Sequence, residues 1–161
     1  MRTHQIVTSF TIVEQFDDLD PADRQLLLRA QEALDDSYSP YSNFQVAAAI
    51  RLENGKLIGG SNQENASYPI CLCAERVTLS AADALFPRQI VEAMAITARN
   101  AEHPLKRPVT PCGSCRQAIF EHSQKQKKAI RLILQGESGA IFIFNSANDL
   151  LPLTFDATFL K

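Results

Sequence analysis

The sequence contains four cysteines in two short motifs that could bind a metal ion. Cys71 and Cys73 form a C-x-C motif, and Cys112 and Cys115 form a C-x-x-C motif. Each motif stands where a loop is expected to enter a helix, and a helix N-terminus carries unpaired N–H groups and about half a positive charge. Cysteines there ionise more readily, and thiolate sites favour zinc. The sequence therefore predicts that Cys73, Cys112 and Cys115 hold one Zn²⁺ ion.

Glu75 follows Cys73 by two residues, in the first turn of the expected helix. It would lie close to the metal without being needed as a ligand. Three protein ligands leave a fourth position open for water, which is the catalytic form of a zinc site. A carboxylate beside that water can take its proton and deliver it elsewhere. Three ligands, a separate Glu and a P-C-x-x-C motif, here 111–115, are the pattern of the zinc deaminases.

A structural zinc site that uses all four cysteines is the main alternative from the residues alone. It leaves Glu75 without a role, and Cys71 is more simply explained as a small buried hydrophobic residue. The three histidines lie outside both motifs, so they are expected to be ordinary surface residues: His4, His103 and His122.

Apolar periodicity and turn signals divide the chain into a helix followed by alternating strands and helices. Asp20 and Pro21 form a typical helix start, and Asn54-Gly55 predicts a β-hairpin. Residues 3–13 are expected to form a strand or an extended arm. The expected helices cover residues 21–36, 73–85, 112–122 and 146–151, and the expected strands cover 44–52, 56–61, 90–98, 129–134 and 141–145.

The order of these elements predicts an α/β domain, with a five-stranded mixed sheet and helices on both of its faces. The last two strands should be antiparallel, because residues 135–140 are too few for a parallel crossover, which needs about a dozen residues. We expect residues 1–20 to be an N-terminal extension and residues 21–161 to be a single catalytic domain.

Composition excludes several classes of function. The 161 residues suit about one domain, and the formal net charge of −2 gives no basic surplus for a nucleic-acid partner. No apolar stretch approaches the ~20 residues that span a bilayer, so no membrane partner is expected. Residues 1–18 lack the apolar core and cleavage site of a signal peptide, so we expect a cytoplasmic protein.

The sequence resembles the nucleoside cytidine deaminases. CAER at 73–76 and PCGSCRQ at 111–117 carry the resemblance, and PYSNFQV at 40–46, NQENASYP at 62–69 and LLPLTF at 150–155 extend it over about residues 22–156. It implies the three-layer α/β/α fold of that family. The implied reaction is zinc-dependent hydrolysis of cytidine or 2′-deoxycytidine to uridine or 2′-deoxyuridine plus ammonia, in pyrimidine salvage, without an organic cofactor.

The resemblance also assigns roles to residues in the metal centre. Cys73, Cys112 and Cys115 are the implied zinc ligands, and Glu75 is the implied proton shuttle. Arg76 matches an arginine that hydrogen-bonds two of the thiolates. Three thiolates on a dication leave a net charge of −1, and Arg76 together with the helix dipoles would offset it.

Further residues match the family's substrate contacts. Asn62 and Glu64 match an N-x-E motif that hydrogen-bonds the ribose 3′-hydroxyl. Phe44 would pack on the pyrimidine, and the Ala74 backbone would contact the base. Two aromatic residues would complete the pocket, often a neighbour's, in a homotetramer with shared active sites: Tyr68 and Phe155.

Departures from the family and alternative functions stay open at this point, and one departure is that the segment between the zinc motifs is long by a few residues, in the loop at 100–109. Ala47 stands where the family often has Gly, and residues 1–20 have no counterpart in short members. A deaminase of another aminopyrimidine, such as blasticidin S or a modified cytosine, is disfavoured by Arg76 and by the Asn62-x-Glu64 pair. A nucleic-acid editor or a noncatalytic zinc module is disfavoured by the antiparallel final strands, the acidic balance and the presence of Glu75.

Overall fold

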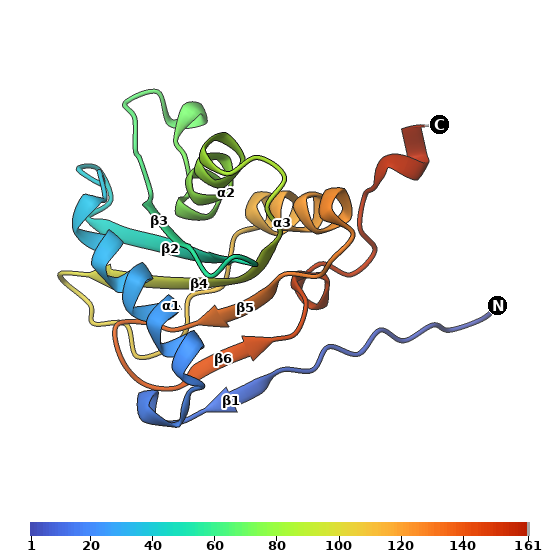
Figure 1. Ribbon diagram of the computed structural model, residues 1–161, viewed down its shortest axis with the longest axis horizontal. Coiled ribbons are helices and arrows are strands. Elements are labelled where there is room, and N and C mark those ends of the chain that lie inside the picture. The colour runs from blue at the N-terminus through green and yellow to red at the C-terminus, as the bar shows by residue number, and fades with distance from the viewer. Residues whose placement is uncertain (161) are drawn as a thin grey trace.

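The computed structural model describes residues 1–160 of the chain and is built on one mixed β-sheet (Figure 1). The six strands lie in the order β1-β6-β5-β4-β2-β3. They are β1 (Thr11–Val13), β2 (Phe44–Leu52), β3 (Leu57–Ser61), β4 (Val91–Asn100), β5 (Arg131–Leu134) and β6 (Ile141–Phe144). The α-helices are α1 (Pro21–Glu32), α2 (Ala74–Leu85) and α3 (Gly113–Gln126). Short 3-10 turns are η1 (Phe16–Asp18), η2 (Ala33–Asp36), η3 (Tyr68–Ile70), η4 (Ala147–Leu150) and η5 (Ala157–Leu160).

Local sequence signals explain where the helices begin. Asp20 caps α1, since its carboxylate accepts a hydrogen bond of 2.9 Å from Ala22 N, and Pro21 occupies the first helical position. Cys73 and Cys112 are the N-cap residues of α2 and α3, and both have extended backbone conformations. The predicted helix starts are therefore confirmed to within one residue, and the last turn of the first helix is a 3-10 turn.

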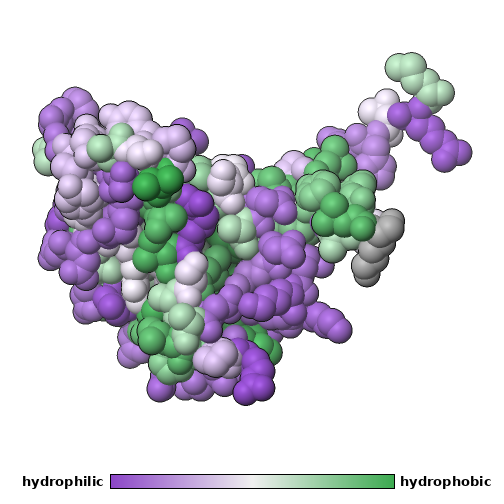
Figure 2. Space-filling model, turned by 90° about the horizontal axis from the view of Figure 1, so that it is seen from above, coloured by the Kyte–Doolittle hydropathy of each residue, from purple (hydrophilic) through white to green (hydrophobic). Residues whose placement is uncertain are grey.

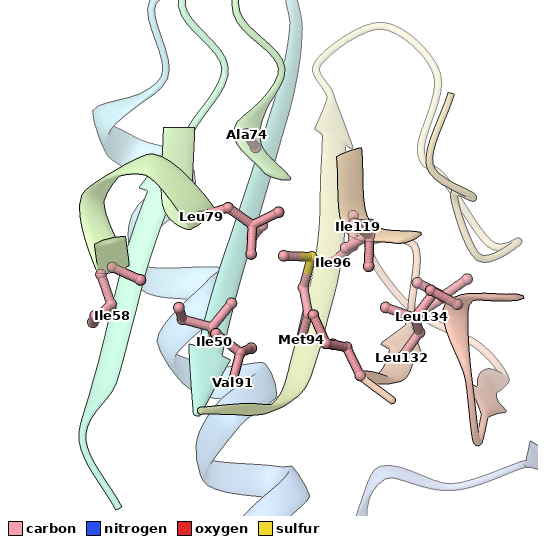
Figure 3. Packing of buried hydrophobic residues seen from close by; sticks show 14 of the residues in the cluster. Ile50, Ile58, Ala74, Leu79, Val91, Met94, Ile96, Ile119, Leu132 and Leu134 are labelled. Carbon is pink, nitrogen blue, oxygen red and sulfur yellow. The ribbon is translucent and has the colours of Figure 1, made fainter. Parts of the chain in front are cut away.

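Strand β2 shows why the sheet has a helical layer on each face. Ala48, Ile50 and Leu52 join the core cluster that contains Leu79 of α2 and Ile119 of α3, as the close packing in Figure 3 shows. The intervening Ala49 belongs to a second cluster, formed with residues of α1. Successive side chains of a strand point to opposite faces. The predicted layered α/β architecture is confirmed.

Strand pairing follows the turn chemistry that the sequence contains. Strands β2 and β3 form an antiparallel hairpin at Asn54-Gly55, where Gly55 has φ of +80°. Strand β4 pairs parallel with β5, and β5 pairs antiparallel with β6. The expectation of antiparallel final strands is therefore confirmed.

The prediction of five strands is wrong, because β1 adds a sixth. Thr11 pairs with Ile143 in an antiparallel ladder that covers the outer edge of β6. Phe10 also stacks on Phe144, with ring centroids 5.0 Å apart. The segment 3–13 was expected to be a strand or an arm, but nothing local in the sequence indicates a partner that lies more than a hundred residues away.

His122 is the second correction. It was expected on the surface, but it is only 8% exposed, and its Nδ1 atom lies 3.9 Å from Asp83 Oδ2 of α2. The side-by-side packing of α2 and α3 buries this face of α3 (Figure 1). His4 and His103 are exposed, as expected. Among residues 1–160, no helix has the length and apolar character needed to cross a membrane.

Candidate metal centre and substrate pocket

Three cysteine sulfur atoms meet where α2 and α3 begin. The Sγ atoms of Cys73, Cys112 and Cys115 all lie within 4.8 Å of one another, and the Cys73 and Cys112 sulfurs are 4.0 Å apart. Zn–S bonds of about 2.3 Å place the sulfurs of a tetrahedral site about 3.8 Å apart. The positive ends of two helix dipoles face this cluster, which favours thiolates. The donor set therefore fits a zinc ion.

The pKa values of the clustered cysteines are shifted in opposite directions, which is consistent with a site that binds a cation. The pKa of the Cys73 thiol is lowered to about 5, because Cys115 and Cys112 donate hydrogen bonds to its sulfur and the Arg76 guanidinium adds positive charge. The pKa of Cys115 is raised, because it is the partner that keeps the shared proton and because it is buried. Three sulfurs that must share protons in this way are suited to a divalent cation, which replaces those protons.

Glu75 lies beside the cluster in the first turn of α2. It is 4% exposed and belongs to the lining of the adjoining cavity. Burial raises the pKa of its carboxyl, and the nearby Cys73 thiolate acts in the same direction. A buried carboxyl that is not a member of the sulfur cluster can take up and release a proton within the cavity.

Arg76 adds charge to the same centre. Its Nη2 atom donates a hydrogen bond of 3.0 Å to the Cys71 carbonyl oxygen, and the guanidinium lowers the pKa of Cys73. Its buried Nε–H finds no hydrogen-bond partner within residues 1–160. An orphaned donor beside a cluster of sulfurs is the arrangement expected of a group that balances thiolate charge.

Cys71 does not join the three-sulfur cluster found in the described part of the chain. Its Sγ atom instead accepts a hydrogen bond of 3.2 Å from Asn65 N. The residue is half-buried and lines the cavity, so the expectation of a buried hydrophobic residue is wrong. The arrangement argues against the four-cysteine alternative.

A cavity of about 310 Å³ opens beside the sulfur cluster, which is enough for a small organic ligand. Six of the predicted site residues line it: Phe44, Asn62, Glu64, Cys73, Glu75 and Cys112. Ala74 and Cys115 are fully buried behind this surface. Sequence reasoning missed Val46, Gln63, Leu72, Val109 and Thr110 in the wall, because apolar and small polar residues in strands and loops have no chemical signature.

Asn62, which lines the cavity, is held by three hydrogen bonds. Its Oδ1 atom accepts hydrogen bonds from Val46 N at 2.9 Å and from Ser37 Oγ at 2.5 Å. Its Nδ2 atom donates to the Phe44 carbonyl oxygen at 3.0 Å. An amide has two N–H groups, so one donor of Asn62 is left for a ligand.

Glu64 is held by the turn that precedes β2. Its Oε2 atom accepts from Tyr41 N at 2.8 Å and from Ser42 N at 3.3 Å, and its Oε1 atom accepts from Ser42 Oγ at 2.5 Å. These bonds, with the Ser42 hydroxyl first, lower the pKa of the carboxyl. Three of about four acceptor positions are filled, so one acceptor is left for a ligand.

Tyr68 and Phe155 are the predicted site residues that the single chain does not bring to the cavity. Tyr68 is 67% exposed and meets Tyr41 edge-on. Phe155 is 57% exposed, and its ring stacks on Phe159 with centroids 5.5 Å apart. Figure 2 shows hydrophobic side chains gathered on the C-terminal segment, which projects beside the main body.

Arg116 is a structural residue of the site that sequence reasoning missed. Its Nε atom donates to the Pro111 carbonyl oxygen at 2.8 Å, next to Cys112, and its Nη1 atom donates to the Leu150 carbonyl oxygen at 2.9 Å. Gln117 Nε2 donates to the Phe155 carbonyl oxygen at 2.9 Å. The R-Q pair after the second cysteine motif therefore fastens both the ligand loop and the C-terminal segment, and its position in PCGSCRQ was the available signal.

Comparison with known proteins agrees with this geometry. Residues 21–130 match the family model described as cytidine and deoxycytidylate deaminase zinc-binding region. A cytidine deaminase from Halalkalibacterium halodurans is 41% identical over 136 residues, which are 84% of this chain and 96% of that protein.

Solved structures give the same result. The crystal structure of cytidine deaminase from Burkholderia pseudomallei matches 81% of this chain and 97% of its own, with a TM-score of 0.70 and 38% identity. That of cytidine deaminase from Mycobacterium leprae matches 83% and 99%, with a TM-score of 0.63 and 33% identity. The family model covers most of the sequence, and the Halalkalibacterium halodurans relative matches over nearly its whole length. The chain therefore belongs to the zinc-binding cytidine and deoxycytidylate deaminase family.

Proposed function

We propose that this protein hydrolyses cytidine and 2′-deoxycytidine to uridine and 2′-deoxyuridine, with release of ammonia, in pyrimidine salvage. One observation carries the proposal: a cavity of about 310 Å³ is lined by the buried Glu75, by two members of the three-sulfur cluster and by Asn62 and Glu64. The lining of one cavity therefore combines a hydrolytic centre with a polar pair. Membership of the family and the names of the relatives support cytidine as the substrate.

Cys73, Cys112 and Cys115 would hold zinc, which when bound supplies a Lewis acid that lowers the pKa of water toward ~7. Glu75 accepts the proton of the attacking water and delivers it to ring N3. The C4–O bond forms and the exocyclic C4–N bond breaks. Glu75 then takes the proton of the hydroxyl group that now stands on C4 and passes it to the departing amino group, so ammonia leaves and a C4=O carbonyl remains. Arg76 keeps the thiolates from accumulating uncompensated charge.

The cavity residues hold the nucleoside in place for this step. The Phe44 side chain packs on the pyrimidine, and the backbone of Ala74 contacts the base. Asn62 and Glu64 bind a sugar hydroxyl, which can accept one hydrogen bond and donate another. The one free donor of Asn62 and the one free acceptor of Glu64 match this requirement.

We further propose that the active form is a cytoplasmic homotetramer in which Tyr68 and Phe155 complete a neighbour's pocket. The exposure of both rings, and their absence from the cavity of their own chain, support this proposal. We propose that residues 21–161 make up the catalytic domain and that residues 1–20 are an extension, from which β1 joins the sheet of that domain.

A metal and activity assay tests the proposed chemistry. Purified protein should contain one zinc per chain, and with cytidine it should lose absorbance near the cytosine band and release ammonia. The variant Cys73→Ser should lose zinc and turnover together, because it lacks one of three ligands. Cys71→Ser, the matched control two residues away, should keep both.

Two results would overturn this assignment. Loss of zinc from Cys71→Ser would show that the fourth cysteine is a ligand. A wild-type protein that holds zinc but releases no ammonia from cytidine would exclude the proposed activity.

A further inference from the structure

Ser42 connects two walls of the cavity although it is not part of either. Its hydroxyl donates a hydrogen bond of 2.5 Å to Glu64 Oε1, and the same oxygen accepts a hydrogen bond of 3.1 Å from Phe44 N. Ser42 lies in the turn before β2, where Asn43 adopts a left-handed conformation with φ of +53°. One hydroxyl therefore fixes a carboxylate at one wall and the first residue of β2 at the other.

The bonds around Glu64 determine which of its oxygens can reach a ligand. Two backbone N–H groups occupy Oε2, so that oxygen is saturated. Within residues 1–160, Oε1 accepts a hydrogen bond only from the Ser42 hydroxyl, which leaves one acceptor position open. Without this hydroxyl the two backbone N–H groups would still hold Oε2, but Oε1 would lose its one hydrogen bond, so the direction of its free acceptor would be less tightly fixed.

Phe44 is fixed from both sides in the same way. Ser42 Oγ accepts from its N–H group, and Asn62 Nδ2 donates to its carbonyl oxygen at 3.0 Å. The ring of Phe44 lines the cavity. The turn residue, the strand residue and the polar pair thus form one hydrogen-bonded unit.

We propose that Ser42 is a positioning residue for the sugar end of the substrate: its hydroxyl directs the free acceptor of Glu64 toward a hydroxyl of the nucleoside while it fixes the start of β2. This inference rests on the proposed function. Ser42 does not touch the reacting atoms, and its contribution depends on Glu64. A charge-assisted hydrogen bond that is lost or misdirected costs about tenfold in the rate constant kcat/KM.

The experiment compares Ser42→Ala with Ser42→Thr, which keeps the hydroxyl, and with Ser67→Ala as a matched control. Ser67 is an exposed loop residue whose side chain does not cap the turn that follows it. Each variant is assayed with cytidine, 2′-deoxycytidine and 3′-deoxycytidine. We expect Ser42→Ala to lower kcat/KM about tenfold for the two substrates that keep the 3′-hydroxyl, mainly by raising KM. It should change 3′-deoxycytidine less than about threefold, and Ser42→Thr and Ser67→Ala should stay near wild type.

A double-mutant cycle with Glu64→Gln separates positioning from a general structural defect. In that background Ser42→Ala should have little further effect, because the interaction through which it acts is already lost. Equal loss for all three substrates, or full additivity with Glu64→Gln, would overturn the role of Ser42 and leave the proposed function standing. A wild-type enzyme that deaminates none of the three substrates would overturn both proposals.

Discussion

Glu75 places a carboxylate where burial disfavours its charged form. It is 4% exposed, and burial together with the Cys73 thiolate raises the pKa of its carboxyl. The helix N-terminus partly offsets this cost, since its N–H groups favour negative charge. A group whose two protonation states are brought closer in free energy moves a proton more easily in either direction.

Glu75→Gln should keep the fold and the zinc content but lose turnover by ~10²–10⁴-fold, the usual value of general acid–base catalysis. The amide has nearly the same shape as the carboxylic acid, but it cannot shuttle a proton. Metal analysis and ammonia release measure the two properties separately. Glu102→Gln, in an exposed loop, is the matched control. Near-normal turnover by Glu75→Gln would remove this residue from the mechanism.

The identities of the cavity and cluster residues were the most predictable part of the site. The hydrogen bonds that hold their side chains in place were the least predictable part. The cluster of Cys73, Cys112 and Cys115 could be predicted from two motifs, because cysteine spacing at helix starts has a direct chemical meaning. Asn62 could be proposed as a polar contact, but the sequence does not show that its side chain makes two hydrogen bonds to β2 and one to Ser37. Such bonds depend on which loops the fold brings together.

Among the elements, α2 and α3 carry most of the site, and their packing also creates a buried histidine. His122 of α3 lies against α2, and burial lowers the pKa of its imidazole below the ordinary 6.5, although Asp83 acts in the opposite direction. Lys125 also faces Asp83, at 2.9 Å, and further disfavours a second positive charge. Folding therefore shifts the balance of this histidine toward its neutral form.

The free energy of unfolding should decrease as the pH falls below the ordinary pKa of this histidine, 6.5. In that range the unfolded chain binds a proton that the folded chain resists, so acid favours unfolding. The variant His122→Gln cannot titrate and should show a flatter stability profile between about pH 7 and pH 5. Chemical denaturation across this range, with the exposed His103→Gln as control, measures the difference. Identical slopes for wild type and His122→Gln would contradict the prediction.

Elements with strong local signals were predictable to within a few residues, whereas pairings between distant elements were not. Strand β2 was predicted with its observed bounds, since Phe44–Leu52 has a continuous apolar centre and a hairpin turn after it. Helix α3 was expected to end at His122 but extends four residues further, to Gln126. The last turn of the helix is polar and contains no Gly or Pro, so the sequence does not indicate where it ends. The structure ends it at Lys127, which adopts a left-handed conformation. The pairing of β1 required knowledge of the whole sheet.

At the scale of the whole molecule, the C-terminal segment exposes several apolar side chains that its own chain does not cover. Leu153 is 91% exposed, and the rings of Phe155 and Phe159 stack on each other in the open. Gln117 nevertheless donates a hydrogen bond to the Phe155 carbonyl oxygen, so this segment is anchored to helix α3. Exposed apolar groups on an anchored segment are typical of a surface that a second copy covers.

A mixing experiment tests whether Phe155 serves a neighbour. Phe155→Ala and Glu75→Gln chains should each be nearly inactive alone. If the ring acts across an interface, mixed assemblies contain some pockets with an intact Glu75 and an intact Phe155 from different chains. Those pockets should recover activity after co-refolding, and mixing two batches of the same variant is the control. No recovery, with subunit exchange verified, would reject the shared site.

The β1–β6 ladder joins residues near the beginning of the chain to residues near its end, so it cannot form until most of the chain has been synthesised. Thr11 leaves the ribosome early, but its partner Ile143 is made only after most of the protein has been translated. Until then Phe10, which packs on Phe142 and Phe144 in the complete structure, has no partner. Contacts of such long sequence separation form slowly, and unpaired strands invite misassembly. Closing this ladder would be a late step in biosynthesis, so in a chain interrupted before residue 141 Thr11–Val13 should be cleaved by proteases more readily than in the complete protein.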